Sequence, residues 1–281
     1  MIRSTVVRLS ILLCALTLAL SFGWAAPAAA MPDPGPRGAE YVSLGDSFVA
    51  SGSMSTATGE ACGQATDNVG RLVAQRMRGV SFADWACGGA DTADFTEVTD
   101  KGPQIRGLSE KTKYVSISIG GNDENLFGGV VQDCLVGALC TEQHTRAALD
   151  KLDRLGPKLD RVYAAVRESA PNAKVVVLGY LRLLPDTPAG CFADVVTGPS
   201  VVRFANRLQA GLNGTIAEAA ERAGFTMVNQ EPPAGRSMCA PDGRRYVSLT
   251  GVGPRDAGVP IHPTLAGRKY TARLIADALA A

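Results

Sequence analysis

The chain has 281 residues, of which 46% are hydrophobic and 20% are charged. This composition suits one substantial folded core, and it excludes the disordered, collagen-like and coiled-coil classes. The formal net charge is only +1, so the chain lacks the basic surplus with which proteins that bind nucleic acid hold phosphates.

Residues 1–30 have the pattern of a cleaved export signal. Arg3 and Arg8 precede an apolar stretch, Leu9–Trp24, and the segment ends in the small residues APAAA. A membrane-spanning helix needs about 20 apolar residues, which is more than this stretch contains. We therefore predict a signal peptide over residues 1–30, a secreted mature domain over residues 31–281, and no stable membrane anchor.

The cysteines of the mature chain favour disulfide bonds. One of the seven cysteines, Cys14, lies within the predicted signal, without the preceding small residue that a lipidation site requires. The others are Cys62, Cys87, Cys134, Cys140, Cys191 and Cys239. An even set in an exported protein is typical of disulfides, and no C-x-x-C motif indicates a zinc or redox site. We expect no metal and no cofactor.

Short apolar runs alternate with longer segments of helical periodicity along the mature chain. After a Pro/Gly-rich lead, the predicted strands are Tyr41–Leu44, Val80–Ala86, Tyr114–Ile119, Lys174–Gly179 and Phe225–Val228. The predicted helices are Val69–Met77, roughly Thr145–Ser169, Val201–Ala223 and Pro263–Ala280. Strands separated by helices imply right-handed crossovers and a parallel sheet covered on both faces. We predict one three-layer α/β/α domain with a five-stranded parallel sheet.

Polar clusters follow the first three predicted strands. Gly45–Ser47 follows the first, Cys87–Asp91 the second and Gly120–Asp123 the third. In an open parallel sheet, ligands bind beyond the carboxyl ends of the strands, so these clusters are expected at one edge. A fourth cluster, Gly258–Thr264, precedes the last predicted helix.

Each cluster has a structural and a chemical interpretation. Asp and Ser commonly cap helices, and Gly and Asn commonly form turns. In the chemical interpretation Ser47 is a nucleophile, while the backbone N–H of Gly89 and the side-chain amide of Asn122 stabilise an oxyanion. The shared edge of the sheet favours the chemical interpretation.

The chain has only two histidines, so a serine hydrolase has few candidates for its general base. His144 lies in the polar stretch TEQHTR, where we expect a helix start at the surface. His262 lies in a Gly/Pro-rich loop and precedes Pro263, which we expect in the first turn of the terminal helix. This loop can hold an imidazole rigidly over the crevice, so His262 is the stronger candidate.

The four clusters resemble, in residues and in order, those of the GDSL or SGNH hydrolases. The motifs GDS, CGGA, GGND and the late HP span nearly the whole mature chain, and the chain is most similar to the exported six-cysteine bacterial lipases and esterases. The resemblance implies a flavodoxin-like fold and ester hydrolysis. It also implies Ser47 as nucleophile, His262 as base, and an oxyanion hole formed by the N–H of Ser47 together with Gly89 and Asn122. No G-x-S-x-G occurs, so the nucleophile elbow of the α/β-hydrolases does not fit.

Two positions depart from the broad family pattern. The family places an acid three residues before the histidine, where this chain has Val259. An imidazole needs an acceptor for its other N–H, and we expect a backbone carbonyl of Val259 or Pro260 in that role, as the six-cysteine lipases also imply, with Asp256 as the alternative. The stretch GDSFVASG also has one more residue before its next glycine than the pattern GDS-x-x-x-G, which leaves the loop shape after Ser47 open.

Sequential pairing of the cysteines suits the fold that the resemblance implies. Each pair could then bridge loops around the crevice, and the first would brace the turn that presents Gly89. The predicted bridges are Cys62–Cys87, Cys134–Cys140 and Cys191–Cys239.

The sequence therefore predicts a secreted carboxylic-ester hydrolase of the lipase or esterase type, a monomer acting on small-molecule or lipid esters, phospholipids among them. Several apolar residues either line an acyl site or belong to the core; these are Phe48, Leu126, Phe127, Val130 and Leu135. Two alternatives remain: a carbohydrate O-acetyl esterase of the same fold, and a non-catalytic exported binding protein.

Overall fold

The computed structural model describes residues 34–136, 141–187, 191, 198–252 and 257–281. All of them lie within the unit Met31–Ala281. The predicted signal peptide, residues 1–30, lies outside the described residues. None of the described helices combines the length and the apolar character that a membrane span needs.

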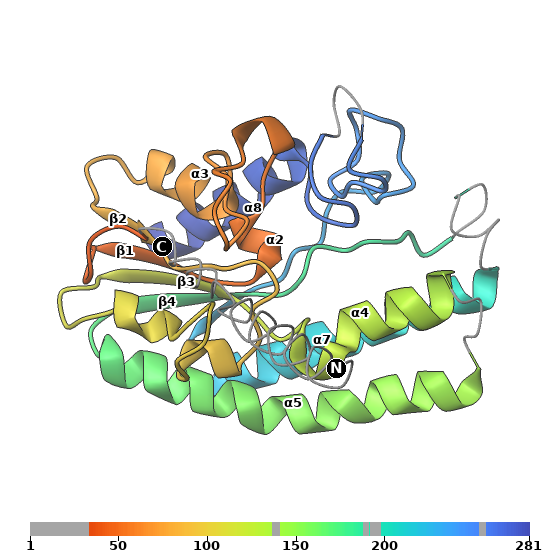
Figure 1. Cartoon of the computed structure of the whole chain (residues 1–281), viewed down its shortest axis with the longest axis horizontal. Coiled ribbons are helices and arrows are strands. Elements are labelled where there is room, and N and C mark those ends of the chain that lie inside the picture. Colours follow the sequence, from red (N-terminus) through yellow and green to blue (C-terminus); the bar gives the residue numbers. More distant parts are fainter. Residues whose placement is uncertain (1–33, 137–140, 188–190, 192–197, 253–256) are drawn as a thin grey trace, which may run out of the picture. The chain divides into compact units, whose positions relative to one another are not determined.

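Five parallel strands form the sheet at the centre of the fold (Figure 1). They are β1 (Tyr41–Gly45), β2 (Phe82–Asp84), β3 (Tyr114–Ser118), β4 (Lys174–Leu178) and β5 (Thr226–Val228). Their order is β2-β1-β3-β4-β5, and every neighbouring pair is parallel. The predicted five-stranded parallel sheet is confirmed, and its first strand is buried along its whole length, as expected of a strand covered on both faces.

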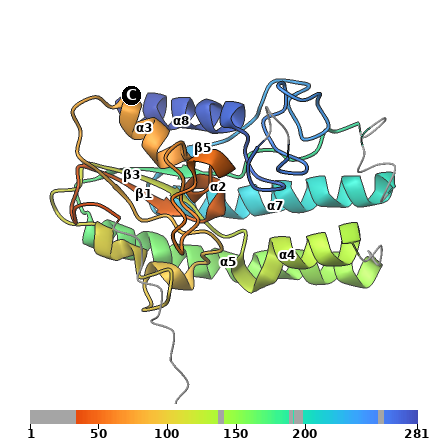
Figure 2. The same ribbon diagram turned by 45° about the horizontal axis from the view of Figure 1, so that its top comes forward.

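Helices cover both faces of the sheet. The helices α3 (Val69–Arg76) and α8 (Leu265–Ala280) lie on one face, and α5 (Glu142–Ser169) and α7 (Pro199–Arg222) on the other (Figures 1 and 2). Alternate residues of the strands pack against each pair; for example, Val176 belongs to the cluster with α3 and α8, and Val177 to that with α5 and α7. This period of two puts apolar side chains on both faces, so the three-layer fold is confirmed.

Shorter helical segments complete the fold. They are α2 (Ser47–Ala50), α4 (Leu126–Val130), the 3₁₀ turns η1 (Met54–Thr56), η2 (Ala93–Phe95), η3 (Gln104–Gly107) and η4 (Asp123–Asn125), and the π-helical turn η5 (Val131–Val136). Most of them follow strand ends, where they shape the loops beside the sheet edge.

Helix caps explain where two predicted boundaries were wrong. The helix α5 begins before the predicted Thr145, because the side chain of Thr141 caps it by accepting from the backbone N–H of His144. The terminal helix begins later than predicted, at Leu265, because Thr264 is its N-cap. Pro263 therefore lies before the cap and outside the first turn.

Buried Arg268 ties α8 to the loop that carries His262. Its side chain is 1% exposed and donates to the carbonyl oxygens of Pro263 at 2.8 Å and Asp67 at 2.9 Å. It also forms an ion pair with the Asp67 carboxylate at 2.7 Å. A buried charge is tolerated when it is paired and hydrogen-bonded, so this side chain can fix the start of the helix.

Two helical glycines provide a test of this packing. A Cβ at Gly267 would collide with the backbone carbonyl of Tyr246, whereas a Cβ at Gly214, in α7, has no neighbour within 4 Å. We expect Gly267→Ala to lower the free energy of unfolding by about 1–3 kcal/mol through overpacking. Gly214→Ala should raise it by up to about 1 kcal/mol, because alanine is the better helix former. Urea denaturation measures both, and a Gly267→Ala protein as stable as the parent would contradict the packing described here.

Candidate active site

The predicted strand-end clusters meet at one edge of the sheet. Ser47 follows β1, and the clusters containing Gly89 and Asn122 follow β2 and β3, which flank β1. The N-cap of α2 is Asp46, whose carboxylate accepts from the backbone N–H of Phe48 at 2.9 Å. Ser47 is thus not the cap, and its hydroxyl is available for other partners.

The hydroxyl of Ser47 pairs with the imidazole of His262. The Oγ atom of Ser47 lies 2.7 Å from Nε2 of His262, and Nδ1 of the same ring lies 2.8 Å from the carbonyl oxygen of Pro260. A carbonyl can only accept, so Nδ1 carries the proton of the neutral ring and Nε2 is left as the acceptor for the serine hydroxyl. Burial lowers the pKa of His262, while the hydrogen bond to Pro260 acts in the opposite direction.

A tight turn presents this carbonyl to the ring. The N–H of His262 donates to the carbonyl of Val259 at 3.3 Å, Pro260 occupies the second position, and Ile261 has a φ of +61°. These are the features of a type II turn, whose third position normally needs glycine. Ile261 is held there because its N–H donates to the carbonyl of Ser248 at 2.8 Å.

The sequence left three candidates for the group that orients His262, and the structure separates two of them. The carbonyl of Pro260 contacts the ring, whereas the carbonyl of Val259 accepts from the backbone N–H of His262. The third candidate, Asp256, lies outside the described residues.

The other two candidates for the oxyanion hole, Gly89 and Asn122, lie in glycine-rich turns. The side-chain amide of Asn122 donates to the carbonyl of Ala90 at 2.9 Å, which links the turns after β3 and β2. Gly89 has a φ of +74°, a conformation that glycine adopts without strain. Asn122 lines the same cavity as Ser47 and His262, whereas Gly89 is not among the described residues that line it.

A disulfide bond joins the loop after β1 to the end of β2. Cys62 and Cys87 are bonded, the N–H of Gly88 donates to the carbonyl of Cys62 at 2.8 Å, and the N–H of Cys87 donates to the carbonyl of Gly45 at 2.9 Å. These contacts hold the turn containing Gly89 beside the strand that precedes Ser47.

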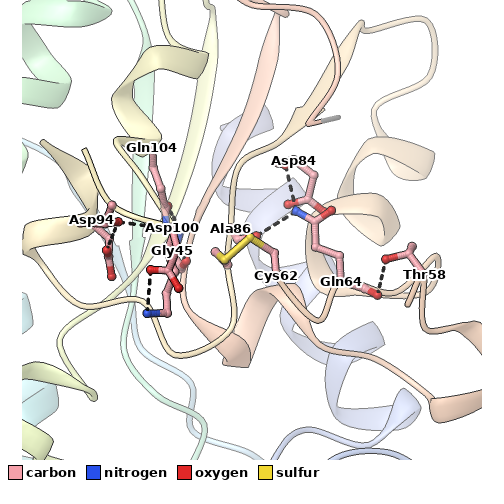
Figure 3. The surroundings of a disulfide bond; sticks show 12 residues. Gly45, Thr58, Cys62, Gln64, Asp84, Ala86, Asp94, Asp100 and Gln104 are labelled. Carbon is pink, nitrogen blue, oxygen red and sulfur yellow. Dashed lines mark hydrogen bonds and ion pairs between the residues drawn. A yellow bond between two sulfur atoms is a disulfide. The ribbon is translucent and has the colours of Figure 1, made fainter. Parts of the chain in front are cut away.

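Two glutamine side chains reinforce this junction (Figure 3). Gln64 donates to the carbonyl oxygens of Asp84 and Ala86, at 3.0 and 2.8 Å. Gln104 accepts from the N–H of Gly45 at 2.8 Å and donates to its carbonyl at 2.9 Å. The backbone on both sides of the disulfide is therefore hydrogen-bonded to buried side chains, as a rigid site requires.

The structure confirms two of the predicted disulfides. Cys62 pairs with Cys87 and Cys191 with Cys239. Cys140 and the side chain of Cys134 lie outside the described part of the chain, so their pairing stays a prediction. The described residues contain no cluster of His, Cys, Asp and Glu that could hold a metal ion.

An apolar cavity of about 420 Å³ opens beside Ser47 and His262. Its walls come from α4 and the start of η5 on one side and from α7 on the other, and they include four of the predicted acyl-site candidates, Phe48, Leu126, Phe127 and Val130. Phe48 and Leu126 also belong to the main core cluster, so both interpretations of these residues hold. The side chain of the fifth candidate, Leu135, lies outside the described residues.

Val201, Ala205 and Leu208 help to form the α7 wall of the cavity, and this wall was not predicted from the sequence. Their helical spacing was the available signal, but the same spacing also predicts core packing. His144, the other histidine, is exposed on the first turn of α5 with its ring bonded to Thr141, away from the cavity.

A buried acid–phenol pair behind the nucleophile was also not identified. Asp46 accepts a hydrogen bond from the hydroxyl of Tyr180, and both residues are fully buried. Burial raises the pKa of Asp46 to about 7, although the hydrogen bond from Tyr180 acts to lower it. No spacing in the sequence links the two residues.

Comparison with known proteins places the chain beside lipases. A model of the GDSL-like lipase/acylhydrolase family matches residues 43–270. Lipase 2 of Streptomyces coelicolor is 32% identical over 270 residues, which cover 91% of this chain and 89% of the relative.

Two solved structures from Streptomyces are also similar. The extracellular lipase of Streptomyces rimosus has a TM-score of 0.69 and 29% identity, over 85% of this chain and 98% of the other. Phospholipase A1 of Streptomyces albidoflavus NA297 has a TM-score of 0.69 and 28% identity, with the same two coverages.

The strained turn before His262 can be tested through stability. Replacing Ile261 by alanine keeps the left-handed conformation and removes half-buried apolar surface, whereas replacement by glycine also removes the strain, which costs about 1–2 kcal/mol for residues other than glycine. We therefore expect Ile261→Gly to be more stable than Ile261→Ala by about 1 kcal/mol in urea denaturation, the reverse of the usual order. If alanine were the more stable variant, the turn would not have this conformation.

Proposed function

Because the chain belongs to the GDSL-like lipase/acylhydrolase family, and is therefore a carboxylic-ester hydrolase of the lipase or esterase type, we propose that it is a secreted lipase. In this proposal, Ser47 attacks the ester carbonyl, His262 is the base, and the cavity beside them binds the acyl chain. Export is supported by the signal-like pattern of residues 1–30, and the similar lipase of Streptomyces rimosus is described as extracellular.

The distance of 2.7 Å between Ser47 Oγ and His262 Nε2 carries the catalytic part of the proposal. As Oγ attacks the carbonyl carbon, Nε2 takes its proton and a tetrahedral oxyanion forms. The protonated imidazole then returns the proton to the leaving alcohol, which departs and leaves an acyl-serine. A water molecule deprotonated by the same nitrogen attacks the acyl carbon; the bond to Ser47 Oγ then breaks, the imidazole returns the proton to Oγ, and the acid is released.

Three donors are proposed to stabilise the oxyanion: the backbone N–H groups of Ser47 and Gly89, and the side-chain amide of Asn122. The amide of Asn122 has two protons and gives one to Ala90, so the other is available to the oxyanion. Donors fixed before the reaction stabilise charge without reorganising, which is why their rigid turns matter.

The cavity beside Ser47 supports an acyl ester with a long chain as the substrate. Its volume of about 420 Å³ falls in the range of small-molecule sites, and each buried methylene contributes about 0.8 kcal/mol. The similarity to phospholipase A1 of Streptomyces albidoflavus makes phospholipids a second candidate class. The apolar walls argue against a carbohydrate O-acetyl esterase.

Substitutions in the proposed site should separate its roles. Ser47→Ala and His262→Ala should abolish ester hydrolysis, and Asn122→Ala should lower its rate by about 10²- to 10³-fold, since one oxyanion donor contributes that much. His144→Ala is the matched control and should retain full activity. Rates on a soluble aryl ester measure all four variants, and an active, folded Ser47→Ala protein would refute the proposed nucleophile.

The orienting role of Pro260 makes a further prediction for Asp256. If a carbonyl orients the imidazole, Asp256→Ala should retain most of the turnover. An orienting carboxylate can contribute up to about 10⁴-fold to the rate. A loss of that size in a folded Asp256→Ala variant would show that the site is a Ser47, His262 and Asp256 triad, and not a pair of Ser47 and His262.

The acyl site can be tested by blocking the cavity. Ala205 lines it from α7, whereas Ala210 on the same helix is exposed. We expect Ala205→Phe to lower kcat/KM for dodecanoyl esters on the order of tenfold or more relative to acetyl esters, and Ala210→Phe to leave this ratio unchanged. A profile from acetyl to hexadecanoyl aryl esters, with phosphatidylcholine and acetylated xylan alongside, measures the preference. Activity confined to the xylan would overturn the lipase proposal.

A further inference from the structure

The hydroxyl of Tyr180 links two turns of the active site. Tyr180 lies just beyond the end of β4 and is fully buried. Its hydroxyl donates to the carboxylate of Asp46, the residue before Ser47, and accepts from the N–H of Gly121, the residue before Asn122, at 2.8 Å. One phenol oxygen therefore holds the backbone on both sides of the proposed reaction centre.

The donor directions in this network follow from the groups involved when Asp46 is ionised. A backbone N–H can only donate, so the oxygen of Tyr180 accepts from Gly121, and an ionised carboxylate can only accept, so the Tyr180 hydroxyl donates to Asp46. The other carboxylate oxygen of Asp46 accepts from the N–H of Phe48 at 2.9 Å. The Tyr180 hydroxyl and the Phe48 N–H thus both donate to Asp46, an arrangement that suits an ionised carboxylate.

Tyr180 is itself held firmly by its surroundings. Its N–H donates to the side chain of Asn213, on α7, at 2.8 Å, and its carbonyl accepts from the same side chain at 3.0 Å. Its ring packs edge-on against Phe48 and Phe127, with centroids 4.9 and 5.1 Å away. A side chain fixed on this many sides can transmit position to the groups that it binds.

We propose that Tyr180 is a positioning residue for ester hydrolysis, which sets the Ser47 nucleophile and the Asn122 amide at the correct separation by binding Asp46 and Gly121 together. This inference rests on the proposed roles of Ser47 and Asn122. Removal of the hydroxyl leaves Asp46 and the N–H of Gly121 each without that partner. Both turns can then relax independently, and an error of about 1 Å at a reaction centre costs on the order of 10²-fold in rate.

The charge of Asp46 gives the proposal a distinctive readout. The titratable groups that act on Asp46 are Tyr180 and Asp123; Asp123, on η4, accepts from Thr92 and lies 3.6 Å from Lys158. The hydrogen bond from Tyr180 lowers the pKa of Asp46, whereas burial and the negative charge of Asp123 raise it. Without the hydroxyl, the pKa of Asp46 rises further, so this carboxylate becomes protonated at a higher pH than in the parent protein.

The test is Tyr180→Phe, assayed for kcat and KM on a soluble short-chain ester from pH 5 to 9. We expect kcat to fall on the order of 10- to 100-fold with KM little changed, and the acidic decline of kcat/KM to move to higher pH. Two other fully buried tyrosines are matched controls. The hydroxyl of Tyr41 bonds to Ser116 Oγ at 2.8 Å, and that of Tyr163 has no hydrogen-bond partner among the described residues. Tyr41→Phe and Tyr163→Phe should leave kcat and the pH profile unchanged.

A second variant keeps the test decisive if Tyr180→Phe is unstable. Asp46→Asn retains the shape and the acceptor of the carboxylate but cannot ionise, so it should lower kcat and remove the part of the acidic decline that belongs to Asp46. A parent-like pH profile in either folded variant would overturn the inference. Ser47→Ala distinguishes failure of the proposed function from failure of the role of Tyr180. If Ser47→Ala stays active, the proposed function fails. If it is inactive while Tyr180→Phe behaves like the parent, only the role of Tyr180 fails.

Discussion

The hydrogen bond between the imidazole of His262 and the carbonyl of Pro260 is the contact on which the geometry of the site depends. It turns Nε2 toward Ser47, which is 215 residues away along the chain. The bond can form only because the backbone reverses at Ile261 in a left-handed conformation. That reversal is held by the pairing of Ser248 with both Ile261 and His262, and by the contact of Arg268 with the carbonyl of Pro263. Packing at the start of α8 therefore helps to position His262, the base of the proposed Ser47–His262 pair.

A carbonyl in the orienting role suits a base that lies beside an apolar cavity. The ring of Phe48 lies 4.9 Å from that of His262, and burial lowers the pKa of the imidazole. A neutral base is therefore available at neutral pH, and a partial dipole fixes its direction without placing a second full charge next to the acyl chain. The carboxylate of the nearby buried acid, Asp46, accepts hydrogen bonds from Phe48 and Tyr180, whereas the imidazole bonds to Pro260 and Ser47.

Most of the fold and the outline of the site could be predicted from the sequence, because both depend on local patterns. Short apolar runs between helical segments predict buried strands. The motifs at the strand ends locate Ser47 and Asn122 without knowledge of packing. The cap at Thr264 was missed because Pro263 is equally suited to a first helical turn. Ile261 could not be placed, because a β-branched residue with positive φ is held only by tertiary contacts. The pairing of Asp46 with Tyr180 spans 134 residues and leaves no trace in sequence spacing.

The most direct test of the central claim is the tautomer and the pKa of His262, measured by NMR on the protein labelled with ¹⁵N-histidine. The chain has two histidines, and a His144→Ala variant assigns both. The structure predicts that neutral His262 carries its proton on Nδ1 and has a pKa below 6.5, because burial outweighs the hydrogen bond to Pro260. A proton on Nε2, or a pKa raised above 6.5 as a neighbouring carboxylate would produce, would contradict an imidazole oriented by the Pro260 carbonyl.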